Sequence, residues 1–206
     1  MSSTAEIVAR LRHQAEPFSR YMVGIAGPPG SGKSTLSAQL RDGLIAAGES
    51  AIVVPMDGFH FDDAVLNARG HRDRKGAPYT YDVAGFEVLL KRIKAKEPDI
   101  AIPVFDRSME LSRAAADIIS AETKFILVEG NYLLLNSALW NKLKPQFDFT
   151  LDISVPEDEL VRRLMLRWHE HGFDEAYARN WIASNDLLNI REIQSGSAKA
   201  DLTVTG

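Results

Sequence analysis

Residues 21–35 constrain the fold of this chain more than any other stretch, because an apolar strand, a glycine-rich turn and a helix start follow one another there. The stretch contains the spacing G-x-x-x-x-G-K-[ST], filled by Gly27, Gly32, Lys33 and Ser34. In such a turn, consecutive backbone N–H groups point inward and form a concave anion site, to which the following helix adds its unpaired N–H groups. The sequence therefore predicts a phosphate-binding loop between the first buried strand and its helix.

This loop is expected to bind a nucleoside triphosphate. The Lys33 ammonium is expected to reach the β- and γ-phosphates, and the Ser34 hydroxyl is expected to ligate Mg²⁺. The residues predicted to contact the nucleotide are Gly27, Pro29, Gly30, Ser31, Gly32, Lys33, Ser34 and Thr35. An ordinary strand-to-helix turn is the alternative, but the strand before the motif and the helix after it favour nucleotide binding.

Composition places the chain among globular proteins with one domain over residues 1–206. Hydrophobic residues make up 45% of the chain and charged residues 25%, as is typical of a single α/β domain. The formal net charge of −4 does not favour nucleic acid or an acidic membrane surface as a partner. The absence of cysteine excludes thiolate chemistry and agrees with a cytoplasmic location. No segment approaches the roughly 20 apolar residues of a membrane span.

Apolar runs alternate with helical patterns along the chain, which predicts right-handed βαβ units and a mostly parallel sheet. The expected strands cover residues 21–26, 51–55, 100–105, 117–120, 125–130, 147–155 and 200–204. The expected helices cover residues 4–18, 33–47, 83–94, 156–172 and 175–193. Residues 61–82 have no clear pattern, and a segment of this length inside a compact domain is usually functional or mobile.

Polar residues follow three of the expected strands at their carboxyl ends. Ligands of parallel sheets bind beyond these ends, so residues 27–35, Asp57 and Glu129 are expected to converge in one crevice. Asp57 is the candidate general base, since a hydroxyl that attacks a γ-phosphate needs a carboxylate to orient it and accept its proton. Glu129 is expected to act on the Mg²⁺ shell or on the acceptor. A turn-forming Asp before Gly58, and a cap at Glu129, are the structural alternatives.

Arginines on the helix expected at residues 156–172 are candidates for a lid. Arg163 and Arg167 are four residues apart and therefore share a face. Arginines that close over a nucleotide neutralise charge on the transferred group. A solvated face that pairs with Glu159 and Glu170 is the alternative. Arg167 is the stronger candidate because it lies nearer the end of the helix.

Two further features have no decided role. The basic run at residues 69–75 either attracts an anionic substrate or forms a solvated loop. Trp140, Trp168 and Trp181 are expected to pack against other side chains rather than to stack on a ligand.

Four stretches together resemble the P-loop small-molecule kinases related to uridine kinase, pantothenate kinase and phosphoribulokinase. They are residues 27–35, 56–60, 128–130 and 163–172. The resemblance implies a three-layer αβα fold with a 2-3-1-4-5 core sheet and a helical lid. It also implies ATP as the phosphoryl donor, and lid or acceptor segments at about residues 58–82 and 160–175.

By motif match, the resemblance assigns Asp57 as the base, Glu129 to the region of Mg²⁺ and acceptor, and Arg167 to the lid. The residues predicted to be catalytic are Asp57, Lys33, Arg163 and Arg167. The residues predicted to bind Mg²⁺ are Ser34 and Glu129. The residues predicted around the acceptor are Asp57, His60, Tyr79, Arg107 and Glu129.

The chain looks most similar to small bacterial kinases named for fructose transport systems, which implies a sugar as the small-molecule acceptor. Arg107 stands where uridine kinases usually carry a histidine. A nucleoside or pantothenate kinase, and a regulatory P-loop ATPase without an acceptor, remain open. Assembly into a homodimer is left open as well.

Overall fold

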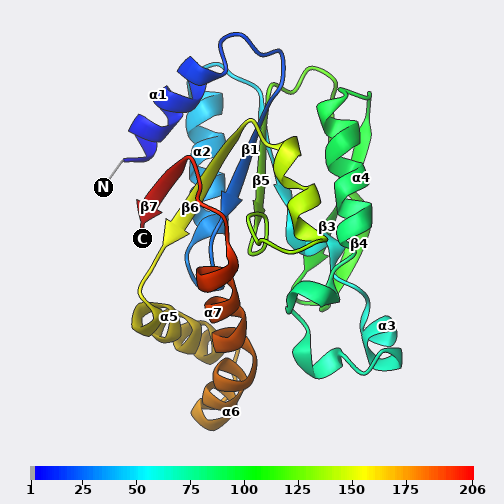
Figure 1. The fold of residues 1–206 in the computed structure, drawn as a ribbon, viewed down its shortest axis with the longest axis vertical. Coiled ribbons are helices and arrows are strands. Elements are labelled where there is room, and N and C mark those ends of the chain that lie inside the picture. Colours follow the sequence, from blue (N-terminus) through cyan, green and yellow to red (C-terminus); the bar gives the residue numbers. More distant parts are fainter. Residues whose placement is uncertain (1–2) are drawn as a thin grey trace.

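A five-stranded parallel sheet forms the centre of the computed structural model, which describes residues 3–206 (Figure 1). The strands are β1 (Tyr21–Ala26), β2 (Ala51–Pro55), β5 (Phe125–Gly130), β6 (Phe149–Ser154) and β7 (Leu202–Thr205). Their order across the sheet is β2-β5-β1-β6-β7. Numbered along the chain, this is the predicted 2-3-1-4-5 order, which is thereby confirmed.

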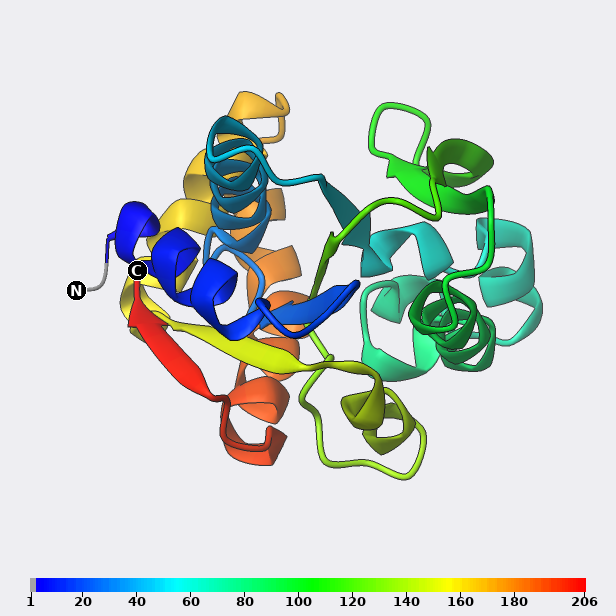
Figure 2. The same cartoon turned by 90° about the horizontal axis from the view of Figure 1, so that it is seen from above.

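Helices cover both faces of the sheet and give the fold its three layers (Figure 2). They are α1 (Thr4–Gln14), α2 (Lys33–Ala46), α4 (Val83–Lys94), α5 (Glu157–Glu170), η4 (Trp140–Lys142) and η5 (Lys144–Gln146). Val23 and Ile25 of β1 face α1, α2 and α5, whereas Met22 faces α4 and η4. Since β1 is buried on both faces, its sequence reads as a continuous apolar run.

A second sheet stands beside the first and consists of the antiparallel hairpin β3 (Ile100–Asp106) and β4 (Leu111–Ile119). The sequence predicts only residues 117–120 of its second strand. Most of β4 is exposed and contains three consecutive alanines, so it has neither the apolar alternation nor the composition of a typical strand. Pairing with β3, across an irregularity between Ile102 and Val104, is what extends it.

Residues 61–82 contain more helical structure than the sequence predicts. They contain α3 (Asp63–Ala68), η2 (Arg72–Arg74) and η3 (Pro78–Thr80). Asp62 caps α3 by accepting a hydrogen bond from the Ala64 N–H at 2.8 Å. The Thr80 hydroxyl accepts from the Gly76 N–H at 3.0 Å and donates to the Ala77 carbonyl at 2.7 Å. Such local bonds leave no periodic signal in a sequence.

The lid region follows β6 and lies beyond the carboxyl ends of the strands (Figure 1). It consists of α5, α6 (Glu175–Trp181) and α7 (Leu187–Gly196). The sequence predicts one helix from residue 175 to residue 193, but a π-helical turn (Ile182–Asp186) separates α6 from α7. Within residues 3–206, no helix is both long and apolar enough to cross a membrane.

Candidate active site

A cavity of about 740 Å³ lies between the phosphate loop, the segment after β2, the tip of the β3–β4 hairpin and the lid. The loop residues that line it are Pro29, Gly30, Gly32, Lys33, Ser34 and Thr35. Gly32 precedes α2 with a φ of 91°, a left-handed conformation that favours glycine. No side chain caps α2, so the N–H groups of its first turn remain available to an anion.

Two carboxylates come close to Lys33. Asp57 lies in η1 (Met56–Phe59), directly after β2, and Glu129 lies near the end of the neighbouring strand β5. Burial lowers the pKa of Lys33, and the charges of Glu129 and Asp57 oppose that shift. The structure thus brings together the loop, Asp57 and Glu129, which are far apart in sequence.

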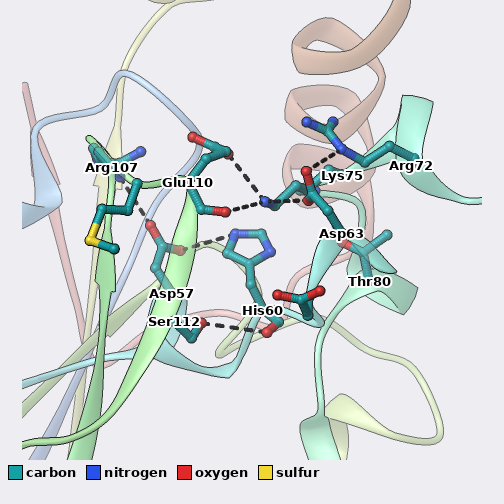
Figure 3. A network of polar contacts seen from close by, with 12 residues as sticks. Asp57, His60, Asp63, Arg72, Lys75, Thr80, Arg107, Glu110 and Ser112 are labelled. Carbon is teal, nitrogen blue, oxygen red and sulfur yellow. Dashed lines mark hydrogen bonds and ion pairs between the residues drawn. The ribbon is translucent and has the colours of Figure 1, made fainter. Parts of the chain in front are cut away.

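Asp57 is held in its ionised form. Its Oδ2 atom accepts a hydrogen bond from Nη2 of Arg107 at 3.0 Å (Figure 3). Burial disfavours the carboxylate, but the attraction of positive neighbours outweighs burial, so the pKa of Asp57 lies below its ordinary value. His60 in its charged form gives the largest of these attractions, followed by Arg107, Lys33 and Arg167. His60, whose Nε2 lies 4.0 Å from Asp57 Oδ1, is uncharged at neutral pH because burial lowers its pKa to about 4.

Ser34 and Glu129 offer oxygen ligands for Mg²⁺. The Ser34 hydroxyl donates to Glu129 Oε1 at 3.2 Å, and burial raises the pKa of Glu129, so a cation beside it would favour its charged form. Across residues 3–206, no group of three or more His, Cys, Asp or Glu side chains could hold a metal ion. This donor set fits Mg²⁺, which typically takes one or two protein oxygens together with substrate phosphates.

The basic run at residues 69–75 is engaged inside the protein. Lys75 Nζ is buried and donates to Asp63 Oδ1 at 2.7 Å and to the Glu110 carbonyl at 2.9 Å (Figure 3). Arg72 donates to the second oxygen of Asp63 at 2.7 Å. The charges of Arg72 and Lys75 tie the segment after β2 together and to the hairpin tip, and both residues also line the cavity.

A second set of bonds ties the same segment to the lid. Arg74 donates to the Ser184 carbonyl at 2.7 Å and to Asn189 Oδ1 at 3.1 Å. Asn185, in the π-helical turn, donates to the Lys75 carbonyl at 2.9 Å. The acceptor-side segment therefore contacts both the hairpin and the lid.

The lid arginines differ in their contacts. Arg163 lines the cavity, donates to Glu159 at 2.7 Å and reaches the Ser31 carbonyl at 3.4 Å. Arg162 pairs with Glu159 outside the cavity. Arg167 lines the cavity, and its guanidinium forms no hydrogen bond or ion pair with any residue from 3 to 206. The predicted pairing with Glu159 is thus made by both Arg162 and Arg163, and of these two only Arg163 also lines the cavity.

Sequence reasoning misplaced or missed several residues of the cavity wall. Tyr79 is 48% exposed and packs against His71 outside the cavity, whereas Tyr81 lines it and stacks on His60 at 4.0 Å. Trp168 and Trp181 line the cavity beside two other aromatic side chains of the lid. The wall also contains Lys75 and Phe105, together with the unpredicted Glu110, Asn131, Asn185, Asp186 and Asn189. Asn131 follows β5 directly, so the rule of strand ends could have found it.

Comparisons with known proteins identify relatives that match nearly the whole chain. The crystal structure of a provisionally assigned fructose transport system kinase from Silicibacter sp. TM1040 is 38% identical, with a TM-score of 0.95 over 99% of this chain and 100% of that one. The uncharacterized protein YggC of Escherichia coli (strain K12) is 33% identical over 193 residues, which are 91% of this chain and 78% of YggC.

A provisionally assigned uridine kinase of Schizosaccharomyces pombe, C227.14, is 31% identical over 210 residues, covering 96% of this chain and 86% of that protein. No protein-family model matches the chain.

Proposed function

Because this chain belongs to the P-loop small-molecule kinases of the uridine kinase, pantothenate kinase and phosphoribulokinase group, we propose that it phosphorylates a hydroxyl of a fructose-like sugar. It is an ATP-dependent small-molecule kinase, and the sugar is the proposed part. Support for a sugar comes from the 38% identical protein that is named for a fructose transport system. In this proposal residues 1–206 act as one kinase domain.

The phosphate loop and Lys33 hold the triphosphate of ATP. Ser34 and Glu129 would hold Mg²⁺, which when bound neutralises charge on the phosphate oxygens. Arg163 and Arg167 close over the nucleotide from the lid and exclude water from the cavity.

The observation that carries the proposal is the ionised carboxylate of Asp57 beside Lys33. An acceptor hydroxyl in the cavity donates its hydrogen bond to Asp57, which takes the proton as the hydroxyl oxygen attacks the γ-phosphorus. The bond between that phosphorus and the bridging oxygen of ADP breaks in the same transfer. Arg107 and His60 line the cavity around the acceptor, and Tyr81 takes the place at the cavity wall that the sequence gives to Tyr79. Glu129 is buried behind Ser34, whose hydroxyl it contacts.

Release of ADP from ATP and Mg²⁺ across a panel of acceptors tests this function. The panel consists of D-fructose, sorbitol, uridine, pantothenate and D-glycerate. We expect D-fructose or sorbitol to stimulate ADP release. Stimulation by uridine or pantothenate alone would change the acceptor class, and slow turnover that no acceptor changes would favour a regulatory ATPase.

Replacing Asp57 with Asn tests the base. The change keeps the shape of the side chain but removes its basicity, so we expect kcat to fall by about 10²–10⁴-fold, while the Kd for ATP changes less than twofold. Asp73→Asn, an exposed change in η2, is the matched control. Full activity of D57N would contradict the assignment of the base.

A further inference from the structure

The lid side of the cavity contains a carboxylate that the proposed mechanism does not use. Asp186 ends the π-helical turn (Ile182–Asp186) and lines the cavity. Its Oδ2 atom is buried and has no hydrogen-bond partner among residues 3–206. Leaving a buried carboxylate oxygen unpaired destabilises a fold, and π-helical turns are frequent at functional sites. Asp186 is therefore a group whose partner is expected to come from a ligand.

The charged neighbours of Asp186 form no ion pair with it in the described part of the chain. Burial raises the pKa of Asp186 to about 6, against the opposing effects of the Arg167 charge, a hydrogen bond from the Trp168 side chain and the Arg74 charge. Arg74 uses its donors on the Ser184 carbonyl and on Asn189. Neither arginine lies within ion-pair distance of Asp186 in the described part of the chain.

The charges of Asp186 and Asp57 shift the pKa values of the same neighbouring side chains. The charges of both carboxylates affect the pKa of Arg167, which burial chiefly lowers. Both also contribute to the raised pKa of Tyr132, for which burial is the largest cause. Asn131 precedes Tyr132 in the chain, and its buried Oδ1 atom, like Oδ2 of Asp186, has no partner within residues 3–206. The candidate base thus shares the cavity with two unpaired hydrogen-bond acceptors.

The chemistry of these two oxygens restricts the ligand that can satisfy them. A carboxylate and an amide oxygen both accept hydrogen bonds, so the ligand must donate. A carboxylate or phosphate group on the ligand cannot donate when ionised, and Asp186 repels it. An ammonium group is disfavoured by Arg167 and Arg74 nearby. Uncharged hydroxyl groups can donate a hydrogen bond and are repelled neither by Asp186 nor by the two arginines.

The positive charges on the acceptor side also favour an uncharged ligand. Lys75 is paired with Asp63 and Glu110, Arg72 with Asp63, and Arg107 with Asp57. An anionic acceptor would have to share each of these cations with a carboxylate that already neutralises its charge. Arg167 is without a partner in the described chain, and it belongs to the nucleotide lid.

We propose that Asp186 and Asn131 form a hydroxyl-recognition wall, which selects uncharged acceptors with hydroxyl groups in addition to the one that is phosphorylated. This inference rests on the proposed function and specifies its acceptor. It makes Asp186 a residue that determines specificity, without a part in proton transfer.

Steady-state kinetics of Asp186→Asn and Asn131→Ala with D-fructose and sorbitol test the wall. Hydrogen bonds to a charged group are strong, so for D186N we expect KM for the sugar to rise about 10–100-fold. In D186N, the KM for ATP and kcat are expected to change less than twofold. N131A is likewise expected to raise the KM for the sugar and to leave the KM for ATP unchanged. Glu170→Gln, an exposed change of the same charge on α5, is the matched control.

Two further readouts separate recognition from a structural role. In the wild type, KM for D-fructose is expected to rise as the pH falls through 6, because protonation of Asp186 removes its best acceptor, and D186N is expected to lose this dependence. At pH 8, D186N is expected to raise Tm, because the buried carboxylate is no longer charged. A lower Tm at pH 8 with equal loss toward ATP and sugar would overturn the proposal.

The acceptor panel separates failure of the inference from failure of the function. Phosphorylation of D-glycerate or pantothenate, but of none of the neutral compounds D-fructose, sorbitol and uridine, would keep the kinase and overturn the wall. The same holds if D186N keeps the wild-type KM for the sugar. Turnover of no acceptor at all would overturn the proposed function, and the inference would fall with it.

Discussion

At the scale of single residues, Asp57 combines two requirements of a general base. It must be ionised at neutral pH, and it must still be free to accept a proton from a neighbour. Arg107 meets the first requirement through the ion pair at 3.0 Å, and the second oxygen of Asp57 has only the uncharged His60 nearby, at 4.0 Å. The residue that ionises the base therefore comes from the hairpin, and the base itself from the segment after β2.

Replacing Arg107 with Ala should move the pH dependence of kcat. The positive charges hold the pKa of Asp57 below its ordinary value, so the wild-type kcat is expected to stay constant down to about pH 5. Without Arg107 the pKa rises, and the acid limb of the profile is expected to shift to higher pH. Arg113→Ala, on the same hairpin outside the cavity, is the control. An unchanged profile would show that Arg107 does not tune the base.

At the scale of elements, Lys75 joins three pieces of the acceptor side. Its side chain binds α3 through Asp63 and the hairpin tip through Glu110, and its backbone carbonyl binds the π-helical turn through Asn185. The Lys75 side chain is only 5% exposed, so its bonds are shielded from water. These pieces are short, and none has a hydrophobic core of its own.

Replacing Lys75 with Ala should loosen this junction. The change deletes the hydrogen bonds of Lys75 to Asp63 and to the Glu110 carbonyl, so we expect a loss of about 2 kcal/mol in the free energy of unfolding and a higher KM for the acceptor. Lys91→Ala, which removes an exposed i,i+4 pair on α4, is the control and is expected to change little. Urea unfolding of both variants measures the difference. An equal loss of unfolding free energy in the two variants would show that the bonds of Lys75 contribute no more than an exposed ion pair.

The elements also differ in how far the sequence predicts them. The bounds of β1, β2, β5 and α4 agree with the prediction, because these elements bury continuous or periodic apolar faces. The same strands place the phosphate loop, Asp57 and Glu129 at one edge. The sequence does not predict the cavity wall around Lys75 and Asp186. This wall is held by side-chain hydrogen bonds between distant segments and by the extra residue of the π-helical turn.

At the scale of the whole molecule, the cavity is lined on one side by the lid and on the other by the segment after β2 and the hairpin. Four aromatic rings line its lid wall, with Trp168 5.8 Å from Trp181 between ring centroids. Phe173 and Tyr177, which complete this set, are 41% and 42% exposed. Large exposed aromatic surface on a cavity wall is expected to become covered when the cavity fills.

Tryptophan fluorescence should therefore report ligand binding. We expect addition of ATP and acceptor to change the emission, because Trp168 and Trp181 pass from water into a drier environment. The double change Trp168→Phe and Trp181→Phe is expected to abolish the signal, whereas Trp140→Phe, in the core, is expected to keep it. A signal that survives the double change would place the ligand away from this wall.

The long connection from β2 to β5 is one continuous segment of the chain. Residues 56–124 leave the sheet after Pro55 and return at Phe125, where β5 lies next to β2. This one excursion contains Asp57, the Lys75 junction and the whole hairpin, and none of the phosphate loop. A single contiguous exchange between two such enzymes would thus transfer the candidate base, Lys75 and the hairpin, and would leave the phosphate loop, Asn131 and Asp186 of the host in place.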